Sequence, residues 1–79
     1  MSVNAEGSDK VTISLSKDFY DIDSIRSSAK EFSNLCSTEI KENERFDVVL
    51  ESKGEIDIKI LAYEFCNYVL ASMKNKNIV

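Results

Sequence analysis

Alternation of apolar and polar residues predicts three β-strands. Over residues 11–16, apolar side chains alternate with small hydroxyl side chains, which is the period-two pattern of a strand with one buried face. The same alternation occurs over 38–41 and again over 46–51. The polar residues 42–44 between these two segments tolerate a turn, so the second and third strands are expected to form a hairpin.

Two further segments repeat apolar residues at the three- and four-residue spacing of an amphipathic helix. The first stripe consists of Ile22, Ile25, Ala29, Phe32 and Cys36. The second stripe consists of Ile58, Leu61, Ala62, Phe65, Cys66, Val69, Leu70 and Met73. Asp21 and Asp57 precede the two stripes, and we expect their carboxylates to cap the free N–H groups of the first helical turns.

The resulting order, β-α-β-β-α, predicts a two-layer α+β fold. Two amphipathic helices and three one-sided strands share one core only if both helices lie on the same sheet face. A right-handed crossover and a hairpin then give the strand order 1-3-2, which is a ferredoxin-like split unit lacking its fourth strand. We expect a single domain over residues 10–74, a flexible tail over 1–9 and a frayed tail over 75–79.

The predicted order leaves one edge of the first strand free. A bare edge pairs with a second copy, is covered by a tail or captures a peptide by strand addition. We therefore predict a partner-binding site on this strand, formed by Val11, Thr12, Ile13, Ser14 and Leu15. The sheet face opposite the helices is expected to be polar, with Val49 as its one apolar residue.

Three residues of the second helix complete the predicted partner-binding site. Asn67 lies between core residues and is a mediocre helix former. It is either an exposed or bridging polar residue, or it hydrogen-bonds to a neighbouring strand or a partner. Tyr63 and Tyr68 flank the apolar stripe, and tyrosine is favoured at interfaces because its ring is apolar and its tip is polar.

Composition and charge narrow the class of protein. The 79 residues leave room for one domain, and 43% hydrophobic with 30% charged residues is typical of a globular chain. Since there is no long apolar run and no signal-peptide pattern at residues 1–9, we expect a cytoplasmic location. The net charge of −4, with scattered basic residues, argues against binding to nucleic acid or to an anionic membrane.

The chain contains few of the residue types that catalysis and metal binding need. The chain has no His, the commonest general base and metal ligand. Cys36 and Cys66 have no CxxC pattern and fall on predicted apolar faces, so we interpret them as buried thiols, with a disulfide as the alternative. The acidic cluster at 18–23 lacks the glycine and glutamate of a calcium loop and is explained by helix capping. We therefore expect a protein that is not an enzyme and that uses no metal or cofactor.

Four stretches of the chain resemble one family of small proteins. They are VTISLSKDFYDIDSIRSSAKEF (11–32), CSTEI (36–40), DVVL (47–50) and EFCNYVL (64–70). In these stretches the chain is similar to the HxsD-type proteins, which are encoded beside His-Xaa-Ser repeat peptides and radical-SAM maturation enzymes. The resemblance implies an accessory role in a peptide-modification system. The partner would then be a peptide-maturation enzyme or its substrate.

Three functions remain open from the sequence. The first is an accessory module that binds a peptide or protein through the free sheet edge. The second is a homodimeric structural domain whose edge pairs with itself. The third is a small enzyme or regulator with a ligand between the helices and the sheet. The sequence ranks them in this order because it supplies an edge and no reactive set of residues.

Overall fold

The structure, a computed structural model, describes residues 2–5, 9–54 and 56–77, with side-chain detail for 9–54 and 56–74. Its elements are β1 (Ser2–Ala5), β2 (Lys10–Leu15), α1 (Ile22–Glu31), β3 (Cys36–Glu42), β4 (Phe46–Ser52) and α2 (Ile58–Asn77). The predicted α+β class is confirmed. The order β-α-β-β-α is also confirmed, and one additional strand precedes it.

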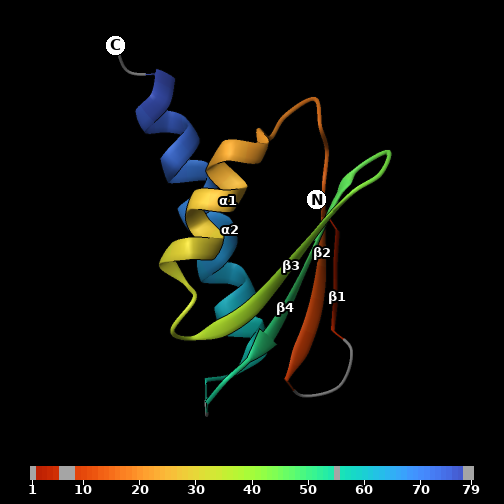
Figure 1. Ribbon diagram of the computed structural model, residues 1–79, viewed down its shortest axis with the longest axis vertical. Helices are drawn as coiled ribbons and strands as arrows, with labels where there is room; N and C mark the ends of the chain where they lie inside the picture. The colour runs from red at the N-terminus through yellow and green to blue at the C-terminus, as the bar shows by residue number, and fades with distance from the viewer. Residues whose placement is uncertain (1, 6–8, 55, 78–79) are drawn as a thin grey trace.

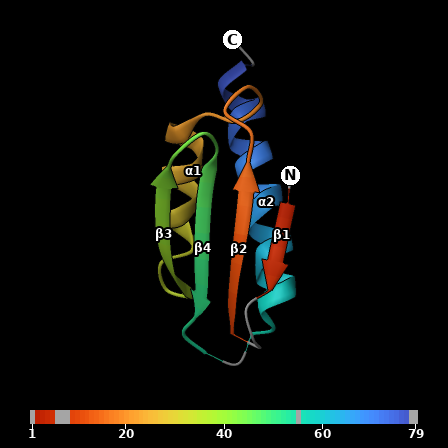
Figure 2. The same cartoon turned by 90° about the vertical axis from the view of Figure 1, so that its right-hand side faces the viewer.

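The strands form one antiparallel sheet in the order β1-β2-β4-β3, and both helices cover the same face of it (Figures 1 and 2). The three predicted strands therefore have the predicted order 1-3-2, with β4 between β2 and β3. Figure 2 shows α1 behind β3 and β4, and α2 behind β2 and β1. Helix α2 contacts β1, β2 and β4, so it covers the middle of the sheet.

Strand β1 occupies the edge that we predicted to be bare. It pairs antiparallel with β2, with Val3 opposite Ile13 and Ala5 opposite Val11. The predictions of a flexible tail and of a missing fourth strand are therefore wrong for residues 2–5. Residues 1 and 6–8 of the predicted tail lie outside the described residues. The fourth strand of this ferredoxin-like sheet is supplied from before β2 and not from after α2.

Two helix boundaries also differ from those predicted. Helix α2 continues through Asn77, so residues 75–77 are helical and only 78–79 of the predicted tail lie outside the described residues. Helix α1 ends at Glu31, and Cys36 begins β3 instead of extending the helical stripe. The reason is the strand period, because Cys36, Thr38 and Ile40 lie on the same, inward face of β3.

The core lies between the sheet and the helices. Alternate residues of β2 and β4 are buried against the inner face of α2. Phe65 has no exposed surface, and its ring meets that of Phe32 edge to face with centroids 5.5 Å apart.

The predicted helix caps are confirmed. Asp21 accepts from the Ser24 N–H, and Asp57 accepts from the Lys59 N–H, each at 2.8 Å.

Two serines of α1 are buried, which the apolar pattern does not indicate. Ser24 and Ser28 have no exposed surface and lie on the helix that packs along α2. Their hydroxyls are satisfied within α1: the Ser24 hydroxyl donates to Asp21 Oδ2 at 3.0 Å, and the Ser28 hydroxyl donates to the Ser24 carbonyl at 2.8 Å. Small side chains with internal partners let α1 lie close to its neighbours without leaving unpaired polar groups.

Candidate protein-binding surface

The part of the predicted site on β2 is not available to a partner. Val11, Ile13 and Leu15 are fully buried beneath the helices. The backbone of the strand pairs with β1 on one side and with β4 on the other. The free-edge prediction is therefore wrong, because residues 2–5 of the same chain cover the edge. Thr12 and Ser14 lie on the open sheet face, where the Ser14 hydroxyl accepts from Arg45 Nε at 2.7 Å.

The part of the predicted site on α2 is exposed, but its members lie on two sides of the helix. Tyr68 leans toward α1, and its ring packs edge to face on Phe32 with centroids 5.8 Å apart. Tyr63 is 69% exposed and contributes to the outer side of the helix, as does the exposed Asn67. The structure therefore keeps Tyr63 and Asn67 together and separates Tyr68 from them.

Two residues that were not predicted to belong to the site extend this outer side. Ile60 is 60% exposed, and Leu70, predicted to lie in the core, is 47% exposed. Together with Tyr63 and Asn67 they form what we call the outer stripe of α2. The signal in the sequence is a second helical period, because these four residues follow one another at steps of three, four and three. The buried stripe on the opposite side of α2 hides this pattern.

The outer stripe differs from the other exposed apolar residues of the molecule. Phe19, Leu35 and Ile56 are also exposed, but each lies singly in a connection between elements. Single exposed apolar residues are ordinary on protein surfaces. A row of large apolar side chains along one helix face is the pattern of a protein-binding surface.

The charges beside the outer stripe are unevenly distributed along α2. Lys59 and Glu64 flank its first half, and both side chains are exposed. From residue 65 to residue 77 the sequence has no acidic residue, and Lys74 follows the stripe at its end. The two halves of the helix therefore present different charge patterns to a partner.

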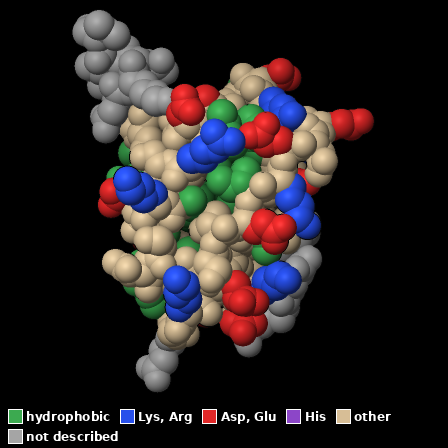
Figure 3. Space-filling model, viewed as in Figure 1, with side chains coloured by type: hydrophobic (Ala, Val, Ile, Leu, Met, Phe, Trp, Pro, Cys, Tyr) green, Lys and Arg blue, Asp and Glu red, His purple; other side chains and the backbone are tan. Residues whose placement is uncertain are grey.

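A second surface with apolar character lies between α1 and β3. Figure 3 shows hydrophobic side chains gathered there in the middle of one face of the molecule, with charged side chains of both signs around them. The half-buried residues from these two elements include Ile22, Ala29 and Ile40. Arg26 of α1 reaches across to Glu42 at the end of β3, with 3.5 Å between Arg26 Nη2 and Glu42 Oε1. Both side chains are exposed, so this ion pair contributes little to stability.

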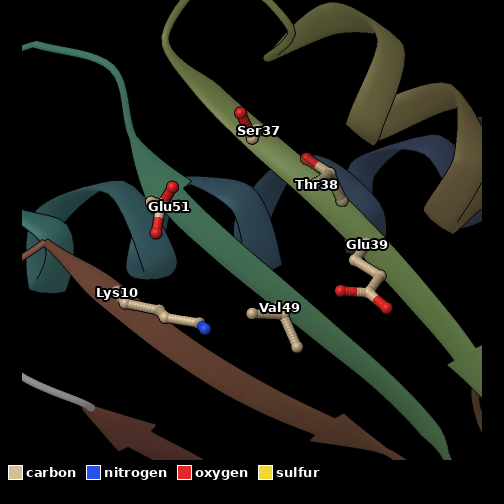
Figure 4. A pocket seen from close by; sticks show the side chains of 6 residues that line it. All are labelled: Lys10, Ser37, Thr38, Glu39, Val49 and Glu51. Atoms are coloured by element: carbon tan, nitrogen blue, oxygen red, sulfur yellow. The ribbon is translucent and has the colours of Figure 1, made fainter.

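The open sheet face is polar, as predicted, and has shallow hollows. One of about 170 Å³ is lined by Lys10, Ser37, Thr38, Glu39, Val49 and Glu51 (Figure 4). Lys10 points toward Val49, with acidic side chains on either side of them (Figure 4). A hollow of about 290 Å³ adjoins it and shares Lys10, Glu39 and Val49. Lys10, Glu39 and Glu51 give this face mixed charge.

The two thiols are free and buried, as interpreted from the sequence. Burial raises the pKa of the Cys66 thiol. It also raises that of Cys36, where a hydrogen bond with Thr38 and the charge of Lys53 oppose the shift. A raised pKa keeps both thiols protonated at neutral pH, and the thiolate is the reactive form. They are therefore residues of the core and not candidate nucleophiles.

The described residues contain neither a candidate membrane-spanning helix nor a candidate metal site. No helix among them is both long and apolar enough to cross a bilayer. Their His, Cys, Asp and Glu side chains form no group of three or more that could hold a metal ion. The acidic residue Asp21 instead caps α1.

Comparison with known proteins identified no relative: no family model, curated protein or solved structure matches the chain.

Proposed function

We propose that the chain is a non-catalytic protein-binding module whose binding surface is the outer stripe of α2. The observation that carries the proposal is the exposure of Ile60, Tyr63 and Leu70 on one side of a helix whose other side is buried in the core. Full burial of an exposed Ile or Leu side chain is favourable by about 1.5–3 kcal/mol, and the partly exposed Ile60 and Leu70 would gain part of this in an interface. Tyr63 adds a hydroxyl that can hydrogen-bond at the rim.

The non-catalytic part of the proposal rests on the residues available. The sequence has no His, and both thiols are buried and protonated at neutral pH. The accessory role in peptide modification rests on the resemblance to the HxsD-type proteins. Under this proposal the module acts in the cytoplasm, with neither nucleic acid nor membrane as its partner.

Affinity capture tests the proposal with the full chain as bait. The prey is native lysate in one experiment and a differently tagged copy of the chain in the other. Ile60→Glu and Leu70→Glu place a charge where the wild-type side chain is already exposed, so the fold is retained, and circular dichroism checks this. We expect each variant to lose most of the protein that the wild type captures.

Ser27→Glu is the matched control, because Ser27 is exposed on α1, away from the outer stripe. It should capture the same proteins as the wild type. If the two α2 variants also capture the same proteins in the same amounts, the outer stripe is not a binding surface and the proposal is wrong.

A second candidate function, peptide capture, is favoured by the position of β3. This strand forms the other edge of the sheet, and among the described residues it pairs only with β4. Its outer edge adjoins the half-buried apolar residues between α1 and β3. A peptide added to β3 would gain main-chain hydrogen bonds and an apolar surface for alternate side chains.

Hydrogen exchange tests this second function with peptides selected from a random library on the full chain. A captured strand should slow the exchange of alternate β3 amides and leave those of β2 unchanged. Selected peptides that leave every β3 amide unchanged would exclude this function.

A further inference from the structure

We infer that the occupant of the outer stripe is a second copy of this chain, with the two α2 helices packed side by side in parallel. This inference rests on the proposed function and names the partner. It is carried by the spacing of the outer stripe and by the charges beside it. The two copies would be related by a two-fold axis running along the helices.

The spacing of the outer stripe is that of a coiled-coil seam. Ile60 and Asn67 are seven residues apart, as are Tyr63 and Leu70, and the two pairs interleave as the a and d positions of a heptad. Ile at an a position and Leu at a d position favour two-stranded parallel packing. The seam is short, with two heptads between Ile60 and Lys74, but α2 is already ordered by its buried face. Pairing therefore does not have to meet the cost of forming the helix.

The flanking charges match in a parallel pair. With Ile60 at position a, Lys59 is at g and Glu64 is at the following e. In a parallel two-stranded arrangement, a g residue of one helix lies beside the e residue five positions further along the other helix. Lys59 of one copy therefore faces Glu64 of the other. The two-fold symmetry makes this contact twice.

An antiparallel pair through the same seam lacks this match. It would place Lys59 beside the C-terminal half of the other helix, where residues 65–77 contain no acid and include Lys74. It would also place the two Glu64 side chains near one another. The charge pattern of α2 therefore selects the parallel orientation.

Asn67 has a defined role in this arrangement. It would meet its counterpart at the a position of the other helix, where the two amides can hydrogen-bond to each other. A single asparagine at an a position fixes the register and the number of helices at a cost in stability. This explains a polar side chain in the middle of an apolar stripe. Lys74, at the next a position, marks the end of the seam, where a long side chain can reach water.

Charge reversal tests the pairing without disturbing the core, because Lys59 and Glu64 are both exposed. Sedimentation equilibrium of the full chain should show the mass rising with concentration from the 8.9 kDa of one chain toward that of a dimer. Lys59→Glu alone and Glu64→Lys alone each create two like-charge contacts and should raise the dimer Kd about tenfold. The double variant Lys59→Glu/Glu64→Lys restores both contacts and should return the Kd to that of the wild type.

Crosslinking tests the orientation. In the parallel pair, Ile60 of one copy lies beside Ile60 of the other, whereas in an antiparallel pair the two lie at opposite ends of the seam. The exposed variant Ile60→Cys should therefore form an intermolecular disulfide under mild oxidation. Ser27→Cys on α1 is the matched control and should stay monomeric on a non-reducing gel, as should the wild type with its two buried thiols.

The outcomes separate the inference from the function on which it rests. A dimer in which the double variant recovers the Kd and Ile60→Cys crosslinks supports the inference. A chain that stays monomeric at all concentrations overturns it, and so does a dimer that is insensitive to charge reversal or fails to crosslink. A monomer whose outer stripe still captures another protein in the affinity experiment overturns the second-copy inference and leaves the proposed function standing.

Discussion

At the scale of single residues, Phe65 is the side chain that connects the two helices within the core. It is fully buried on α2, and its ring contacts Phe32 at the C-terminal end of α1, so it joins the two helices as well as filling the core. Most residues of the buried core to which it belongs come from β2, β4 and α2. A cavity at this position would therefore weaken both the contact between the two helices and the packing of α2 on the sheet.

Phe65→Ala is expected to lower the free energy of unfolding by about 3–5 kcal/mol, the usual cost of emptying a buried aromatic site. A small domain has only roughly 5–15 kcal/mol to lose. Urea unfolding followed by circular dichroism measures the change, with Phe19→Ala, at an exposed aromatic side chain outside the outer stripe, as the control. An unfolding midpoint equal to that of the wild type would contradict the packing described for α2.

The two buried thiols make the stability of the protein depend on pH in the alkaline range. Burial raises the folded-state pKa of Cys36 and Cys66 above the ordinary value of 9.0, so the folded chain holds these protons more tightly than the unfolded chain. Their contribution to stability is fully present below the ordinary value and is lost as pH rises toward the raised folded values. The wild type should therefore exceed the double variant Cys36→Ala/Cys66→Ala in unfolding free energy by less at pH 10 than at pH 8. A difference that stays constant between these pH values would show that the thiolates are tolerated in the fold.

At the scale of elements, strand β1 closes the sheet on the side of β2. It pairs with β2 along Ser2–Ala5, while β4 pairs with the opposite edge of β2. Strand β2 is therefore an inner strand, and the outer edges of the sheet are those of β1 and β3. A chain without β1 would regain the bare edge that the three-stranded prediction implied.

Deleting residues 1–8 is expected to expose one edge of β2. Backbone amides of residues 11–14 of β2 should all exchange slowly in the full chain, because both edges are paired there. In the shortened chain, the amides that face β1 should exchange fast while those bonded to β4 stay slow. Hydrogen exchange followed by NMR measures this, with the amides of β3 and β4 as the internal reference. Unchanged exchange throughout β2 would mean that β1 contributes no protection.

The elements that could be predicted from the sequence are those with a strong period. The alternation in β2, β3 and β4 and the buried stripe of α2 gave the strand order and the layer arrangement. Strand β1 was missed because a four-residue segment has too few positions to show a period, although its partner β2 is the next element in the chain. Half of the candidate site was missed for a related reason. Leu70 fits the spacing of both the buried and the outer stripe, and only the packed helix shows that it faces outward.

At the scale of the whole molecule, the two faces have different characters. The open sheet face is polar with mixed charges, while the helical layer carries the outer stripe of α2. A pair of molecules joined through α2 would therefore bury its helices in the middle and present two polar sheets outward. The β3 edges and the apolar region between α1 and β3 would stay accessible in such a pair, so self-association and peptide capture are compatible.

Thermal stability should depend on protein concentration if the chain pairs through α2. Binding that favours the folded form raises Tm, and for a dimer a tenfold rise in concentration above the Kd should raise Tm by roughly 3–5 °C. Differential scanning calorimetry over a concentration series measures the slope. Lys59→Glu should reduce the slope, and the double variant Lys59→Glu/Glu64→Lys should recover it. A Tm independent of concentration would exclude coupling between pairing and folding.

The place of β1 beside β2 also has a consequence in time, during synthesis of the chain. β1 and β2 follow one another closely along the chain, whereas β4, which pairs with the other edge of β2, is made some thirty residues after β2. Local pairing is fast, and pairing across a long stretch of chain is slow. Until β4 has been made, a β2 strand that is paired with β1 exposes one unpaired edge to neighbouring nascent chains, instead of two. Strand β1 would therefore cover an edge of β2 during synthesis as well as in the folded sheet.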